Sequence, residues 1–265
     1  MSVLTRKQIC SLYKKFAEDL ISVHEQQAQF FKRFRTKSYQ KNRFINALLY
    51  HGRAFQVRGI TNTGEKEIVY PPSYEDLEAE ITYLLIRMFK PKSTVEISPA
   101  SGWSTSWILF ALRDNGSGLL TSFDLVDMAQ KMLPNDLTKN RWNFILGDVK
   151  QQMNKIPKNI DYLFLDSDHS ASFADWYLDN VFPLVKSGSP VSIHDVWLKN
   201  IKTYGEIAKV LNWIRESNIE YVSPSKYAPN SIRSEVLAVR KELGLNSFIH
   251  FSQVNPSIFF LMPAK

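Results

Sequence analysis

Short apolar segments that alternate with helical patterns are the feature that most constrains the fold of this chain. Five such segments follow one another, at residues 94–97, 119–123, 142–146, 162–165 and 191–193. Strands this short, separated by helices, are typical of a parallel sheet with helices on both faces. We therefore predict an α/β fold with a doubly wound, mostly parallel sheet.

Further elements are expected on both sides of this core. Thr5 and Gln8 form a plausible capping box for a first helix. A second apolar set at residues 44–49 predicts another helix, residues 51–70 look irregular, and Ser73 is placed to cap the helix that follows. The tail is expected to add helices and strands at residues 206–217, 220–223, 231–243 and 257–262.

These elements predict two parts of the chain. Residues 1–70 would be an N-terminal helical extension that acts as a substrate lid or a dimer contact, and residues 71–265 would be the sheet domain. One cysteine, Cys10, excludes an internal disulfide. The lack of a long apolar run argues against a membrane span or a signal peptide, so we expect a cytoplasmic protein.

The positive charge is concentrated in one segment. The net charge is +7, and residues 26–64 contain eight Lys and Arg but no Asp or Glu, which leaves 25 basic and 26 acidic residues elsewhere. Such a segment could bind phosphates, acidic substrates or acidic surfaces. The alternative is that it forms a solvated helix face or a contact between subunits.

Residues 95–105 predict a ligand-binding corner. They read Val-Glu-Ile-Ser-Pro-Ala-Ser-Gly-Trp-Ser-Thr, which is a strand end, a short turn and the start of a helix. Nicotinamide and flavin cofactors need Gly-x-Gly-x-x-Gly at such a corner, whereas Gly102 stands alone here. A corner with one glycine, and with Glu96 just before it, suits a cofactor without phosphates such as S-adenosylmethionine. The alternative is an ordinary buried strand and helix.

Acidic residues follow all five predicted strands. They are Glu96, then Asp124, then Asp148, then Asp166 and Asp168 with His169, and finally Asp195 with His194. Ligands in open α/β sheets bind at the carboxyl ends of the strands, so these residues predict one site. Asp124 is placed for ribose hydroxyls and Asp148 for the adenine amine. The last two groups either hold a hard divalent cation or transfer protons through His169.

Together the motifs resemble class I S-adenosylmethionine-dependent methyltransferases, in particular the subgroup of small-molecule and sugar O-methyltransferases and cephalosporin-hydroxylase-like proteins. The motifs that carry the resemblance lie at residues 95–105, 122–124, 146–148, 165–169 and 193–195. The resemblance implies a Rossmann-like seven-stranded sheet whose last strand is antiparallel. It also implies methyl transfer to a hydroxyl, amine or amide of a small molecule.

The same resemblance assigns individual residues. The methionine part of S-adenosylmethionine would lie among Glu96, Ser98, Ala100, Ser101, Gly102 and Ser104, with Asp124, Asp148 and Asp166 along the rest of the cofactor. Ser98 replaces a glycine, which is tolerable if its φ is negative.

A divalent cation, Mg²⁺ or another, would bind Asp166 and Asp195 in the metal-dependent relatives. In those relatives the third ligand is often an Asn directly after the second Asp, and this chain has Val196 at that position. Some relatives instead have an acid directly before the second Asp, and this chain has His194 there. We expect His169 to be the catalytic base, with a helix-capping histidine as the alternative.

Three rival functions remain. The basic segment could serve an RNA or peptide N-methyltransferase, but Asp-Ser-Asp-His at residues 166–169 differs from the Pro-Pro-aromatic motif of many base N-methyltransferases. A non-catalytic binding protein is disfavoured because Glu96, Asp124 and Asp148 are intact.

We expect a small-molecule acceptor, no membrane partner and a homodimer. Trp197, Trp213 and Tyr227 either line the acceptor pocket or belong to the core.

Overall fold

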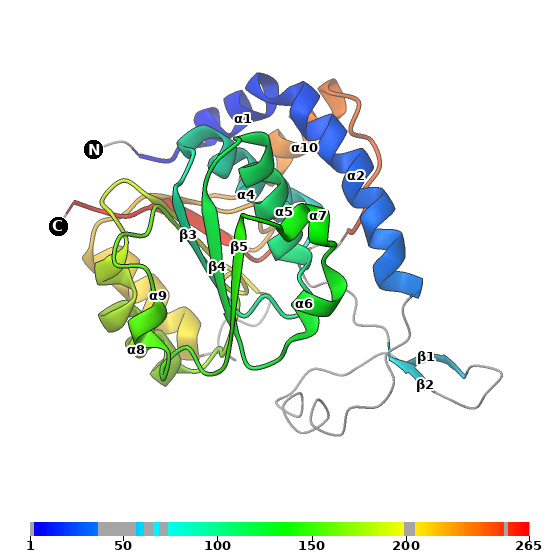
Figure 1. Cartoon of the computed structure of the whole chain (residues 1–265). Coiled ribbons are helices and arrows are strands. Elements are labelled where there is room, and N and C mark those ends of the chain that lie inside the picture. The colour runs from blue at the N-terminus through cyan, green and yellow to red at the C-terminus, as the bar shows by residue number, and fades with distance from the viewer. Residues whose placement is uncertain are drawn as a thin grey trace.

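A seven-stranded sheet forms the centre of the protein (Figure 1). The computed structural model describes residues 3–36, 57–60, 66–68, 74–198, 205–251 and 254–264. The sheet consists of β3 (Ser93–Ile97), β4 (Leu119–Asp124), β5 (Trp142–Leu146), β6 (Tyr162–Leu165), β7 (Pro190–Ile193), β8 (Tyr221–Val222) and β9 (Ile258–Leu261). Their order is β5-β4-β3-β6-β7-β9-β8, and β9 is antiparallel to both of its neighbours. This confirms the expected doubly wound sheet with an antiparallel last strand.

Helices cover both faces of the sheet. The described α-helices are α1 (Arg6–Lys15), α2 (Ala17–Thr36), α4 (Asp76–Phe89), α5 (Trp103–Asp114), α6 (Met128–Met132), α7 (Asn135–Thr138), α8 (Ala171–Asn180), α9 (Gly205–Glu216) and α10 (Arg233–Glu242). Two short 3₁₀ turns lie at Met153–Lys155 and Phe182–Leu184. In Figure 1, α4 and α5 lie on one side of the sheet together with α1, α2 and α10, and α8 and α9 lie on the other.

The central strands are buried on both faces, and their side chains alternate between two hydrophobic clusters. In β6, Tyr162 and Phe164 pack with α4 and α5, whereas Leu163 and Leu165 pack with α8 and α9. The period-two alternation of a strand produces this division. Both faces are apolar, which explains why these strands read as continuous apolar runs.

Several local expectations need correction. The helix that begins at Asp76 has Glu75 as its N-cap, in a capping box with Glu78, whereas Ser73 lies outside the described residues. Within the segment expected to be irregular, β1 (Val57–Ile60) pairs with β2 (Lys66–Ile68) as an antiparallel hairpin.

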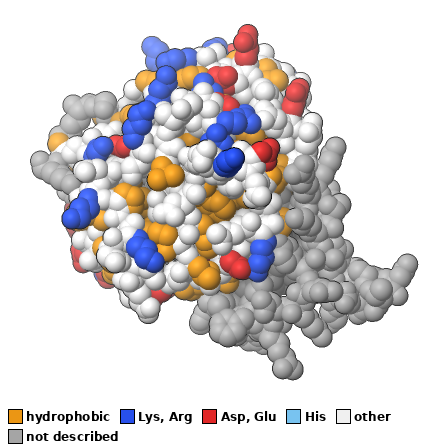
Figure 2. Space-filling model, viewed as in Figure 1, with side chains coloured by type: hydrophobic (Ala, Val, Ile, Leu, Met, Phe, Trp, Pro, Cys, Tyr) orange, Lys and Arg blue, Asp and Glu red, His pale blue; other side chains and the backbone are white. Residues whose placement is uncertain are grey.

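Other expectations are confirmed or stay open. The capping box of Thr5 and Gln8 is confirmed. The helix predicted around residues 44–49 lies outside the described residues, as does most of the basic segment at residues 26–64. On the face drawn in Figure 2, the Lys and Arg side chains of the described residues are spread around a central apolar area rather than gathered in one patch.

The N-terminal helices share the core of the sheet domain. Apolar side chains of α1 and α2 belong to the same hydrophobic cluster as α4 and α5. The division at residue 70 therefore stays a prediction, and the described part of the extension packs against the domain. No helix among the described residues has the length and apolar character needed to cross a membrane.

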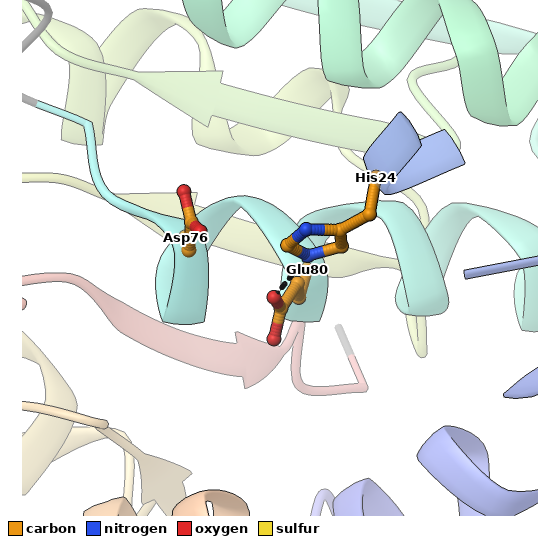
Figure 3. Close-up of side chains that lie close together, drawn as sticks. All are labelled: His24, Asp76 and Glu80. Carbon is orange, nitrogen blue, oxygen red and sulfur yellow. Dashed lines mark hydrogen bonds and ion pairs between the residues drawn. The ribbon is translucent and has the colours of Figure 1, made fainter. Parts of the chain in front are cut away.

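A buried polar network joins α1, α2 and α10 to α4. Glu80 on α4 accepts a hydrogen bond of 2.8 Å from the Tyr13 hydroxyl of α1, contacts His24 of α2 and pairs with Arg240 of α10. Figure 3 shows the His24 ring reaching down from α2 to Glu80. Burial lowers the pKa of His24 to about 4, so the ring is neutral and Arg240 supplies the balancing charge.

Asp76 lies near this network, but its carboxylate has other partners. Its two oxygens accept backbone hydrogen bonds from Ile249 at 2.7 Å and His250 at 3.0 Å. His24, Asp76 and Glu80 are close enough to hold a metal ion. However, the guanidinium of Arg240 already neutralises Glu80, so we interpret the group as structural.

We expect Glu80→Gln to destabilise the protein by about 3–5 kcal/mol, because Arg240 would be left buried with an unpaired charge. Tyr13→Phe is the matched control, since it removes one hydrogen bond to the same carboxylate at a cost of about 1 kcal/mol. Urea unfolding of both variants measures the two effects. Equal losses would show that the ion pair does not hold the helices.

Candidate functional site

The turn after β3 is strained at two residues that are not glycine. Ser98 has φ 66° and Ala100 has φ 49°, so the negative φ expected at Ser98 is wrong. The Ser98 amide donates to the Phe123 carbonyl at 2.8 Å, and the Ala100 amide donates to Asp124 Oδ2 at 2.8 Å. These bonds to β4 hold the turn in the left-handed region, where a side chain costs about 1–3 kcal/mol. Such strain is typical of ligand-binding sites.

Gly102 is the N-cap of α5, and glycine is required there for two reasons. Its φ is 87°, and a Cβ atom would lie 3.1 Å from Leu133 and 3.3 Å from Ala129. The turn is therefore packed tightly on the segment that follows β4. Ala100 is exposed and Ser101 is half-buried, so the outer side of the turn is open to a ligand.

Glu96 lies beneath the turn rather than at its surface. Its carboxylate is fully buried and accepts hydrogen bonds from the hydroxyls of Ser104 at 2.7 Å, Thr105 at 2.8 Å and Ser122 at 2.7 Å. Burial raises the pKa of Glu96 to about 7, although these hydroxyls oppose the rise. Glu96 therefore joins β3, β4 and the first turn of α5 into one unit.

Asp124 is the last residue of β4, and it connects this strand to the turn. Its Oδ2 accepts from the Ala100 amide, and its Oδ1 accepts from the Val126 amide at 3.1 Å. Burial raises the pKa of Asp124 to about 6 against the effect of these backbone donors. Asp124 still has lone pairs to offer, and it lies at the carboxyl edge where a ligand would bind.

Two exposed leucines flank the ends of β4 and β5. Leu125 is 54% exposed and Leu146 is 56% exposed, among the largest values for apolar side chains of the described residues. Asp148 is half-buried beyond Leu146, and its Oδ1 accepts from the Lys150 amide at 2.8 Å. The two leucines could therefore pack against a flat ring of a ligand that also contacts the carboxylates of Asp124 and Asp148. Sequence reasoning missed them, because an apolar residue at a strand end is usually buried.

The ends of β6 and β7 bring Asp166, His169 and Asp195 together, with all three possible ligand atoms within 4.8 Å of one another. His169 Nε2 lies 3.2 Å from Asp195 Oδ2, and His169 Nδ1 lies 2.7 Å from Glu206 Oε2. Burial by itself lowers the pKa of His169, but these two carboxylates raise it to about 10. Asp195 has φ 57°, a further strained position at this edge.

His194 lies behind the two aspartates. Its ring is 1% exposed, and Nδ1 is 3.2 Å from Asp166 Oδ1 and 3.3 Å from Asp195 Oδ1. Nε2 points toward Glu78 Oε1 at 3.7 Å. Burial acts to lower the pKa of His194, but the surrounding carboxylates hold it well above its ordinary value.

The structure also separates residues that the sequence groups together. Asp168 faces solvent and accepts hydrogen bonds from Ser170, the N-cap of α8, so it lies outside the cluster. Trp213 packs against Phe182 and Phe260 as part of the core.

Sequence reasoning missed Glu78 and Glu206, which contact the two histidines. Both are acids in the first turn of a helix, where a carboxylate usually serves only to interact favourably with the helix dipole. Only the tertiary fold reveals their second contact.

A cavity of about 220 Å³ lies between α2, α5 and α7, and Phe30, Arg113 and Leu137 are among its lining residues. None of the candidate site residues lines it. The site is instead defined by the carboxyl edge of the sheet, where both strained turns and the acidic residues meet.

Residues 95–196 match a family model described as a methyltransferase domain. The match begins in β3 and ends directly after Asp195, so it includes the strained turn, Asp124 and the histidine-carboxylate cluster. No curated protein matches the chain.

Solved structures share the fold. A candidate O-methyltransferase from Klebsiella pneumoniae is 14% identical, with a TM-score of 0.51 over 73% of this chain and 84% of that one. A candidate caffeoyl-CoA O-methyltransferase from Staphylococcus aureus is 15% identical, with a TM-score of 0.52 over 73% and 86%. The O-methyltransferase TomG from Streptomyces achromogenes, involved in tomaymycin synthesis and solved with SAM, is 13% identical, with a TM-score of 0.51 over 71% and 80%.

Residues 95–196 of this chain therefore match a methyltransferase domain, and its seven-stranded sheet has the fold of these three solved structures.

Proposed function

We propose that this protein transfers a methyl group from S-adenosylmethionine to a hydroxyl group of a small molecule. One observation carries the proposal: the carboxyl edge of the sheet has two adjacent halves of different chemistry. The ends of β3, β4 and β5 supply a strained turn, Asp124 and exposed leucines. The ends of β6 and β7 supply Asp166, His169 and Asp195.

The first half suits an adenosine that carries no phosphate. Asp124 would accept from the ribose hydroxyls, and Asp148 from the adenine amine, while Leu125 and Leu146 would pack on the ring. When bound, S-adenosylmethionine would supply a methyl group on a positively charged sulfur for transfer to the hydroxyl. The turn at residues 98–102 would hold the methionine part.

The second half would meet the acceptor. Asp166 has the most exposed side chain of the cluster, at 20%, compared with 16% for His169 and 7% for Asp195. The clustered carboxylates favour the positively charged sulfonium and would stabilise a cation next to the reacting oxygen. The three relatives reported above are named as O-methyltransferases, which supports a hydroxyl over an amine acceptor.

We propose a role for His169 other than that of the base that the sequence predicts. Both ring nitrogens face carboxylates, and with a pKa of about 10 the free ring carries both of its protons at neutral pH. A ring in this state has no lone pair with which to accept the hydroxyl proton. We propose that His169 orients Asp195, and that the acceptor proton leaves through Asp166. The expected homodimer stays a prediction.

We expect Asp124→Asn to weaken S-adenosylmethionine binding about tenfold or more, because a charged acceptor contributes about 1.5–3 kcal/mol per hydrogen bond. Asparagine keeps the shape and can still accept from the Ala100 amide. Isothermal titration calorimetry measures the affinity.

Asp175→Asn is the matched control, since Asp175 is a surface carboxylate paired with Lys209 at 2.8 Å. It should bind the cofactor like the unmodified protein. If the unmodified protein is folded and binds no S-adenosylmethionine, the proposed function is wrong.

Glu96 makes the stability of the folded protein depend on pH. Its pKa is raised in the folded protein, so its contribution to stability is complete below about pH 4.5 and is lost as the pH rises to about 7. Between pH 5 and pH 8, we expect the free energy of unfolding of the unmodified protein to fall by about 2–3 kcal/mol relative to Glu96→Gln. Urea unfolding at both pH values measures this difference. Parallel pH profiles of the two proteins would contradict it.

A further inference from the structure

We propose that Gln27 of α2 is a positioning residue for the proposed cofactor, and that it acts through Ser106 and Trp103 in the first turn of α5. The inference rests on the proposed function, because it concerns the turn at residues 98–102 that would hold the methionine part of S-adenosylmethionine. It gives the N-terminal extension a task other than the lid or dimer contact that the sequence predicts: α2 keeps the cofactor turn in its binding conformation.

Gln27 is a fully buried polar side chain that lies among apolar side chains of α2. Its exposed fraction is 0%, and Leu20, Val23 and Phe30 of the same helix are buried in the hydrophobic core. Burying an amide in apolar surroundings is costly unless its polar atoms form hydrogen bonds. An amide at this position therefore needs a specific partner, and the structure provides it in the hydroxyl of Ser106.

Gln27 reaches the first turn of α5 through this one hydroxyl. Gln27 Nε2 donates to Ser106 Oγ at 2.9 Å, and Ser106 Oγ donates to the Trp103 carbonyl at 2.7 Å. Gln27 Oε1 also lies 3.2 Å from the same hydroxyl. Because hydrogen bonds in a chain polarise one another, the two bonds strengthen each other. Gln27 is thereby connected to the residue that directly follows Gly102, the end of the cofactor turn.

The side chain of Trp103 is held by the same helix. Trp103 is 2% exposed, Phe30 stacks with it at 6.4 Å between ring centroids, and Phe31 meets it edge to face at 5.1 Å. Aromatic pairs in these arrangements are favourable beyond the area that they bury. α2, which lies beside α5 in Figure 1, therefore holds Trp103 by its ring and, through Ser106, by its carbonyl.

Three consecutive hydroxyl residues connect this turn of helix to two sides of the protein. Ser104 and Thr105 donate to Glu96 of β3 at 2.7 Å and 2.8 Å, whereas Ser106 bonds to Gln27 of α2. A helix has 3.6 residues per turn, so neighbouring side chains point in different directions and can bind different elements. The run of three hydroxyls is explained by these two partners.

The cofactor turn needs this support because Ser98 and Ala100 have left-handed backbone angles. Strained angles persist only where the surrounding structure over-determines them. Bonds to β4 hold the beginning of the turn, and its end continues through Gly102 into Trp103. If the start of α5 shifted, the turn would relax into conformations that do not fit the cofactor. The apparent affinity falls in proportion to the fraction of molecules in the competent conformation.

Isothermal titration calorimetry with S-adenosylmethionine tests this role. Gln27→Leu keeps a side chain of similar size but removes the donor, and we expect it to weaken cofactor binding about three- to tenfold. Ser106→Ala should weaken binding by a similar factor. The double variant should lose no more affinity than Gln27→Leu alone, because both substitutions break the same connection. Losses that multiply in the double variant would overturn the proposal.

Gln26→Leu is the matched control. Gln26 is the neighbouring residue of α2, and its Oε1 accepts from Arg113 Nη1 at 2.6 Å, so it also joins α2 to α5. Arg113 lies about 10 Å further along α5 than Ser106, at the end away from the cofactor turn. Gln26→Leu should bind the cofactor like the unmodified protein, and urea unfolding checks that both leucine variants are folded. Equal cofactor affinity of Gln26→Leu and Gln27→Leu would overturn the proposal.

Hydrogen exchange of the turn is a readout that does not need the cofactor. Measured by mass spectrometry, the amides of residues 98–106 should exchange at least threefold faster in Gln27→Leu than in the unmodified protein, because the turn opens more often. Their exchange should be unchanged in Gln26→Leu. Unchanged exchange in Gln27→Leu would show that Gln27 does not hold the turn.

The same measurements separate this inference from the proposed function. If the unmodified protein is folded and binds no S-adenosylmethionine, the proposed function fails, and hydrogen exchange still decides whether Gln27 holds the turn. If the unmodified protein binds the cofactor and Gln27→Leu binds it equally well, this inference alone fails.

Discussion

The buried carboxylate of Glu96 is the interaction on which the binding edge depends. It has no cationic partner among its hydrogen-bonding groups, only three hydroxyls, which come from the next strand and from the first turn of α5. β3, β4 and α5 are therefore joined directly beneath the turn. Because both ends of that turn are anchored, Ser98 and Ala100 can keep left-handed backbone angles that a free loop would relax.

The other half of the edge is organised by charge. Carboxylates from four different elements surround the two histidines: Glu78 on α4, Asp166 and Asp195 after β6 and β7, and Glu206 on α9. Two imidazoles, together with Arg233 near Glu78, do not outnumber these four carboxylates, so this half favours positive charge. The positively charged sulfur of the proposed cofactor would meet that requirement.

The sheet could be predicted from the sequence because every central strand is a short apolar run with an acid at its end. The carboxyl-edge positions of Asp124, Asp166 and Asp195 follow from that pattern. The backbone angle of Ser98 does not, because the turn is held by hydrogen bonds from the Ser98 amide to Phe123 and from the Ala100 amide to Asp124. Glu206 could not be predicted either, since its contact with His169 spans 37 residues and is created by the packing of α9 on α8.

The N-terminal helices are held by the opposite end of the chain. Arg6 of α1 pairs with Glu235 of α10 across 229 residues, and Glu80 joins Tyr13 to Arg240. During synthesis α1 and α2 are made well before α10. Contacts between such distant segments slow folding, because a long loop must close before they form. The apolar sides of α1 and α2 can therefore pack on α4 and α5 before α10 exists, but their polar links to α10 must form later.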